Sequence, residues 1–152
     1  MSSHDSIWQK ARKMMVVIEF KSLDEIKDYR EAIKNIGLNI NDCLVLAIVQ
    51  DKKEKAVLTE IHSVNYLSPK DISLLGRLKD DTVNKTLNQQ FDIVVMIGEL
   101  NKKVKKYINR RVKSFFVGVN TGQNDCPLEL KTEDGKPDQM IKFVHNTLQK
   151  IS

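Results

Sequence analysis

The chain has 152 residues, of which 41% are apolar and 30% charged, and its formal net charge at pH 7 is +5. That length and composition suit one globular domain and exclude disordered and collagen-like chains. The apolar run over residues 14–18 ends at Glu19, whereas a membrane-spanning helix needs about 20 apolar residues. We therefore expect a cytoplasmic protein with no membrane partner.

Two cysteines, Cys43 and Cys126, form no C-x-x-C pair. Cys43 opens an apolar run, which favours a buried small side chain, and Cys126 lies in a polar segment. Two isolated cysteines indicate a reducing compartment and two free thiols, and one disulfide between them is the alternative.

The first residues are polar, so residues 1–12 predict a flexible N-terminal arm, and residues 13–152 a single α/β domain. Trp8 either pins this arm to the domain or belongs to a disordered leader. Residues 14–20 are apolar and rich in β-branched side chains, which predicts a buried strand. Ser22 with Glu25 three positions later predicts the start of a helix that ends near Gly37.

The middle of the chain predicts two further strands and two short helices. Residues 43–49 form a continuous apolar run, and residues 56–61 are expected to pair with it as a hairpin after a polar turn. The Ser-Pro-Lys-Asp sequence predicts the start of a short helix over residues 68–76. Another short helix is expected over residues 82–89.

The second half of the chain repeats the alternation of strand and helix. Residues 91–97 and 114–119 read as buried strands, and residues 101–112 as an amphipathic helix between them. Residues 128–132 are placed as an antiparallel edge strand, because the preceding link is shorter than the dozen or more residues of a parallel crossover. A final helix is expected from residue 137, with an apolar stripe that ends near residue 151.

Apolar strands that alternate with amphipathic helices predict an α/β fold in three layers, α/β/α. The sheet is expected to be mostly parallel, with one antiparallel edge strand.

Three stretches, residues 70–76, 91–97 and 113–118, together resemble a family of small, uncharacterised α/β proteins from Bacteroidetes-type bacteria. The resemblance covers roughly the second half of the chain. It implies a Rossmann- or flavodoxin-like sheet and no particular activity.

Ligands of open parallel sheets bind beyond the carboxyl ends of the strands. The candidate ligand-binding residues at these ends are Asp51, Gly98, Glu99, Asn101, Asn120 and Thr121. The strand-to-helix turn over residues 98–103 also predicts an anion site, because a helix N-terminus presents free N–H groups. The first turn of this helix carries Lys102 and Lys103, which the helix dipole disfavours, so a bound anion could compensate for them. The alternative is that exposed lysines tolerate this cost in water.

The positive charge is concentrated in residues 100–114, which contain no acid. Its cations are Lys102, Lys103, Lys105, Lys106, Arg110, Arg111 and Lys113. The lysines of the predicted helix are expected on its outer face, opposite the apolar stripe. The predicted anion-binding side chains among them are Lys102, Lys103, Lys106 and Arg110. Nucleic acid is one such partner, with Tyr107 available to stack on a base, and a solvated outer face is the alternative.

No motif predicts catalysis, a metal or a cofactor. The phosphate-binding sequences G-x-x-x-x-G-K and G-x-G-x-x-G are absent, and the three histidines show no metal-ligand spacing. Gly118 is expected inside a strand, where it allows close packing, and residues 120–122 are expected to form a turn.

The first hypothesis for function is a non-catalytic module that binds an anionic partner or ligand through the basic helix, residues 101–113. A small enzyme or nucleotide-binding protein that uses the carboxyl ends of the strands is the second. The third is a structural or dimerising domain. The sequence does not decide whether the protein is an enzyme, and its oligomeric state is left open.

Overall fold

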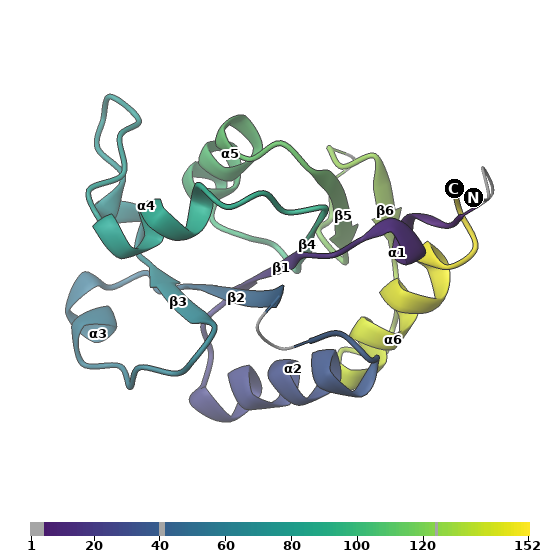
Figure 1. Cartoon of the computed structure of the whole chain (residues 1–152). Helices are drawn as coiled ribbons and strands as arrows, with labels where there is room; N and C mark the ends of the chain where they lie inside the picture. The colour runs from purple at the N-terminus through teal and green to yellow at the C-terminus, as the bar shows by residue number, and fades with distance from the viewer. Residues whose placement is uncertain (1–4, 40–41, 124) are drawn as a thin grey trace.

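The computed structural model describes residues 5–39, 42–123 and 125–152 (Figure 1). Its centre is a single six-stranded sheet in the order β3-β2-β1-β4-β5-β6. Every neighbouring pair in this sheet is parallel. The expected α/β fold is therefore confirmed. The strand order is that of Rossmann-like folds and differs from the flavodoxin-like order, which was the other expectation.

The four strands predicted from continuous apolar runs are all present. They are β1, β2, β4 and β5. The six strands of the sheet are β1 (Met14–Glu19), β2 (Cys43–Ile48), β3 (Val64–Leu67), β4 (Ile93–Ile97), β5 (Phe115–Val119) and β6 (Leu128–Leu130). In β4 every side chain is buried, and in β1 every side chain except that of Glu19. Strands covered by helices on both faces need apolar side chains at successive positions, which explains these unbroken runs.

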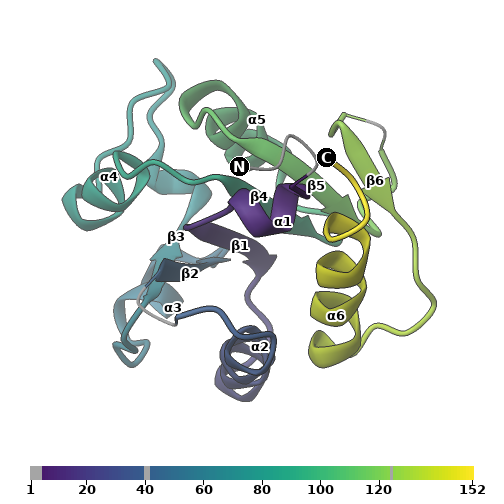
Figure 2. The same ribbon diagram turned by 45° about the vertical axis from the view of Figure 1, so that its right-hand side comes forward.

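Helices cover both faces of the sheet (Figure 2). The helices are α1 (Ile7–Lys10), α2 (Leu23–Asn35), α3 (Lys52–Ala56), α4 (Asp81–Leu87), α5 (Lys102–Arg111) and α6 (Pro137–Leu148), with a 3₁₀ turn η2 (Pro69–Asp71). On one face Val16 lies in a core layer with Ile33 of α2 and Ile141 of α6. On the other face Val17 lies in a layer with Val83 of α4 and Ile108 of α5. Consecutive strand residues thus serve opposite layers.

Strand β6 runs parallel to β5, so the prediction of an antiparallel edge strand was wrong. Leu128 pairs with Val117 and Leu130 with Val119. Because β6 is short and begins beside the middle of β5, the chain must fall back by only two strand positions, roughly 7 Å. The described residues of this link, 120–123 and 125–127, form no helix.

The third strand also lies elsewhere than predicted. Asp51 caps α3 by accepting a hydrogen bond from the backbone N–H of Lys53 at 2.8 Å, so the expected polar turn is helical. Residues 56–61 form no strand, and β3 follows them as a parallel neighbour of β2. Because α3 and the segment after it carry the chain back along the sheet, a hairpin does not form.

The predicted helix over residues 68–76 is reduced to η2. Ser68 and Asp71 form a reciprocal capping box around it. The chain then extends, and Ile72 and Leu78 form an antiparallel bridge instead of a further helical turn.

The expected flexible arm packs on the domain where the structure describes it. The backbone N–H of Ile7 donates to the carbonyl of Ile151 at 2.8 Å, and the Trp8 ring meets the His145 ring edge-to-face at 4.5 Å between centroids. Trp8 therefore pins residues 5–12 to α6, and the prediction for residues 1–4 lies outside the described residues. No helix in the described part of the chain is both long enough and apolar enough to cross a membrane.

Candidate functional site

The strand order reverses between β1 and β4, the two central strands. Beyond their carboxyl ends one connection leads to α2 on one face and the other to α5 on the opposite face, which leaves an opening between them. Two hollows lie there, of about 280 Å³ and about 630 Å³. Glu19 and Glu99 line both, so we describe the two together as the crevice.

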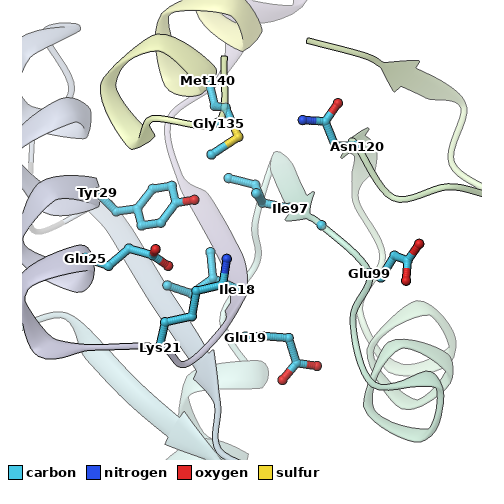
Figure 3. Close-up of a pocket in the computed structure, with 11 residues that line it drawn as sticks. Ile18, Glu19, Lys21, Glu25, Tyr29, Ile97, Glu99, Asn120, Gly135 and Met140 are labelled. Atoms are coloured by element: carbon cyan, nitrogen blue, oxygen red, sulfur yellow. The ribbon is translucent and has the colours of Figure 1, made fainter. Parts of the chain in front are cut away.

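Side chains of α2 and α6, which cover the same face of the sheet, line the smaller hollow together with residues at the strand ends. Figure 3 shows Glu25 and Tyr29 of α2 on one side, and Glu99 and Asn120 on the other, with Met140 above. The Tyr29 hydroxyl and the Asn120 amide nitrogen turn toward the space between them. This hollow is therefore lined by hydrogen-bonding groups at its sides and by an apolar residue above.

Gly98 and Asn120, which both have positive φ, shape the smaller hollow. Gly98 (φ +77°) follows β4 and turns the chain sharply toward Glu99. Asn120 (φ 54°) follows β5, and its side-chain oxygen accepts from the backbone N–H of Thr132 at 2.9 Å. Its oxygen is thereby fixed, which leaves the amide nitrogen directed into the hollow (Figure 3).

Burial raises the pKa of the Tyr29 hydroxyl, and the neighbouring carboxylate of Glu25 raises it further. The hydroxyl therefore stays protonated at neutral pH and can donate a hydrogen bond as well as accept one.

Glu19 holds the start of α5 in place. One of its carboxylate oxygens accepts from the backbone N–H of Asn101 at 2.6 Å, and the other from the side-chain amide of Gln50 at 2.9 Å. Asn101 itself caps α5 by accepting from the backbone N–H of Val104. An anion of the chain thus already sits at the helix N-terminus, where nucleotide-binding proteins place a phosphate.

Lys105 departs from the prediction that the lysines lie on the outer face of the basic helix. It is 6% exposed. Its ammonium lies 2.8 Å from a carboxylate oxygen of Asp125 and donates to the side-chain oxygen of Gln123 at 3.1 Å. It therefore anchors the loop after β5 beside the larger hollow.

Asp125, Cys126 and Glu129 bring potential metal-ligand atoms within 4.8 Å of one another. Each carboxylate already has proton donors: Asp125 faces the Lys105 ammonium, and Glu129 accepts from the Thr121 hydroxyl at 2.7 Å and the Cys126 N–H at 3.2 Å. Burial, with repulsion from Glu129 and Asp125, raises the pKa of the Cys126 thiol to about 12. A protonated thiol is a poor metal ligand, so this group is better explained as a closed hydrogen-bond network.

Most of the ligand-binding residues predicted from the sequence meet in the crevice. Those that line it are Gly98, Glu99, Asn101, Asn120 and Thr121. Asp51 is not among the lining residues and caps α3 instead. Sequence reasoning missed Glu19, Lys21, Glu25, Tyr29 and Gln50. Glu19 ends the apolar run of β1, and that change from apolar to acidic at a strand end is the signal that could have identified it.

The predicted anion-binding residues lie in two places. Lys102 lines the crevice, whereas Lys103, Lys106 and Arg110 line a hollow together with residues 72–76. The Lys103 ammonium donates to the carbonyl of Ile72 at 2.7 Å.

Tyr107 is 6% exposed, and its hydroxyl accepts a hydrogen bond from Arg111, so it does not present a face on which a base could stack. Arg111 is also bound to Asn84 and Asn88 of its own chain. Burial of Tyr107 follows from its position one turn from Val104, on the edge of the apolar stripe.

A model described as a family of unknown function, DUF6913, matches residues 1–151. No match is found among curated proteins. A solved structure described as the apo-form glycosyltransferase GlyE in Streptococcus pneumoniae TIGR4 aligns with 90% of this chain at 9% identity and a TM-score of 0.44. The chain spans 33% of that protein's length, and the activity named is that protein's own.

Proposed function

The chain belongs to DUF6913, a family of unknown function, and we propose that it binds a small polar molecule in the crevice. The observation that carries the proposal is the position of the two hollows. They lie where the strand order reverses between β1 and β4, the place where open parallel sheets bind their ligands.

The charges around the smaller hollow favour a ligand that donates hydrogen bonds. Glu19, Glu25 and Glu99 line it, against a single cation, Lys21. Ionised carboxylates only accept hydrogen bonds, so hydroxyl and amino groups suit them. The Tyr29 hydroxyl adds a group that can both donate and accept. A sugar, a nucleoside or a small amine has this chemistry.

A phosphorylated ligand is disfavoured at the same place. The carboxylate of Glu19 already binds the backbone N–H at the start of α5, and Glu99 lies close by. A phosphate would meet two carboxylates there, and Lys102 is the exposed cation of α5 that lines the larger hollow. A nucleotide therefore fits less well than its unphosphorylated nucleoside.

Other interpretations of the sequence receive less support. Binding of nucleic acid by the basic helix is less well supported, because Tyr107 is buried and cannot stack on a base. Lys105 and Arg111 already form hydrogen bonds within the chain, so fewer cations are left for phosphates. Dimerisation, the cytoplasmic location and an origin in Bacteroidetes-type bacteria stay predictions.

Thermal unfolding with a panel of sugars, nucleosides and amines, each beside its phosphorylated form where one exists, tests the proposal. A ligand at a hundredfold excess over its Kd should stabilise the protein by about 2.7 kcal/mol. We expect the unphosphorylated compounds to act and Glu99→Gln to abolish the shift. Glu60→Gln is the matched control, because Glu60 is exposed and does not line the crevice. A flat response across the panel, or equal shifts in the two variants, would contradict the proposal.

A further inference from the structure

Residues 72–78, which we call the leucine loop, expose two leucines. The exposed fractions are 102% for Leu74 and 86% for Leu75. In Figure 1 this loop is the teal segment before α4 that projects from the upper left of the molecule. Single exposed leucines are common on protein surfaces, but two adjacent ones at a projecting tip form an apolar contact point.

The leucine loop is held in shape by its own hydrogen bonds. The backbone N–H of Ser73 donates to the carbonyl of Arg77 at 2.8 Å, and that of Gly76 to the carbonyl of Ser73 at 2.9 Å. At the base of the loop, Ile72 and Leu78 are buried in the core and bridge each other. The two tip leucines are therefore held outward on a rooted turn.

The acid at the base of the loop is already neutralised. The Lys55 ammonium lies 2.5 Å from carboxylate oxygens of both Asp71 and Asp80. Burial alone would lower the pKa of Lys55, but the hydrogen bonds to these two carboxylates outweigh it and raise that pKa. The side chain of Asp71 is 4% exposed, so its charge contributes little to the outer surface of the loop.

Exposed cations lie near the two leucines, some close in the sequence and some across a shared hollow. Lys70, Arg77 and Lys79 come from the loop and its flanks, and all three are exposed. Lys106 and Arg110 of α5 are exposed as well and line a hollow of about 250 Å³ together with Leu74 and Leu75. In Figures 1 and 2 the tip of the loop and α5 lie on the same side of the molecule. A broad surface can therefore contact both at once.

We propose that the leucine loop and the exposed face of α5 dock on an anionic lipid surface. Leu74 and Leu75 enter the boundary between headgroups and acyl chains, while the cations contact the lipid phosphates. This uses the basic helix in a way that the crevice does not, so it is independent of the proposed small-molecule site.

Charge and shape favour this occupant over the others. A second copy of the chain would bring the same cations face to face, which repels. A nucleic acid would pair with the cations but leave two leucines in water. The sequence predicted no membrane partner because no segment is long enough to span a bilayer, and surface docking needs no such segment.

Co-sedimentation of the full chain with vesicles tests the proposal. We expect binding to vesicles of equal parts phosphatidylglycerol and phosphatidylcholine, little binding to phosphatidylcholine alone, and weakening at about 0.5 M salt. The double variant Leu74→Ser, Leu75→Ser should bind about tenfold more weakly or worse and keep its thermal unfolding temperature, because both side chains are exposed. Val57→Ser is the matched control, since Val57 is 82% exposed and lies at the end of α3, outside the leucine loop and α5.

Three results would overturn the proposal. The first is no binding of the unaltered protein to the anionic vesicles at low salt. The second is equal binding by the leucine variant, which would assign the contact to charge alone. The third is equally tight and leucine-dependent binding to a soluble acidic polypeptide or to a second copy, which would assign the surface to a protein partner.

Discussion

Replacing Gly118 by alanine tests how closely the carboxylate of Glu129 is held against β5. A Cβ atom at residue 118 would lie 2.7 Å from both Cδ and Oε1 of Glu129, closer than real Cβ atoms approach other atoms. The Glu129 carboxylate cannot retreat freely, because it accepts hydrogen bonds from the Thr121 hydroxyl at 2.7 Å and from the Cys126 N–H at 3.2 Å.

The expected cost follows from these contacts. Overpacking in a tight site costs about 1–3 kcal/mol, and losing one hydrogen bond to a charged group costs about 1.5–3 kcal/mol. Replacing glycine by alanine within a strand by itself stabilises the fold by about 0.5–1 kcal/mol. We therefore expect Gly118→Ala to lower the free energy of unfolding by about 3 kcal/mol.

Urea unfolding followed by circular dichroism measures this change, and a double-mutant cycle assigns its cause. In the background of Glu129→Ala the obstructing carboxylate is gone, so the added methyl group should cost less than about 0.5 kcal/mol. Additive effects of the two substitutions, or a cost of Gly118→Ala below about 0.5 kcal/mol in the unaltered protein, would refute the argument from close packing.

Three further outcomes are expected in the same unfolding assay. Lys55→Met should lower the free energy of unfolding by about 3 kcal/mol, because it leaves the buried carboxylate of Asp71 without the Lys55 ammonium. The Lys52 side chain is 60% exposed and its ammonium lies 3.8 Å from Asp71, so Lys52→Met should cost less than about 1 kcal/mol. Equal costs of the two substitutions would contradict the assignment of Lys55 as the partner of Asp71. The pKa of the Cys126 thiol is raised from 9.0 to about 12 by burial and by Glu129 and Asp125. The stability that the buried, protonated thiol contributes is therefore complete below pH 9.0 and is lost as the pH rises toward about 12. Cys126→Ala should lose less stability over this pH range than the unaltered protein, and an unchanged slope of stability against pH would count against this reasoning. Ile108→Ala should cost about 2–5 kcal/mol, because Ile108 is 0% exposed on the buried face of α5, and a smaller loss would mean that this layer can collapse around the cavity.

Local patterns predicted most of the scaffold. The apolar runs that became β1, β2, β4 and β5 are long enough to show burial on both faces, and each lies within two residues of its predicted limits. The capped start of α2 at Ser22 and the apolar stripe of α5 follow from signals within one or two helical turns.

The wrong predictions all concern how segments distant in the sequence are placed relative to one another. A short link before β6 was taken to forbid a parallel strand, but the limit depends on where β6 begins relative to β5, which sequence does not show. Lys105 was predicted on the outer face of the helix with its neighbours, yet its side chain is buried and its ammonium pairs with the carboxylate of Asp125, which lies on another segment. Tyr107 is likewise buried although it interrupts a basic segment.

Periodicity and helix caps act over a few residues, so they are enough to predict an α/β domain with helices on both faces of a largely parallel sheet. The tertiary structure alone decided the direction of β6, the meeting of Glu19 with the start of α5, and the exposure of Leu74 and Leu75. Those features depend on contacts between segments distant in the chain, and each such contact is set by the path of the loops and the packing of the layers rather than by local preference.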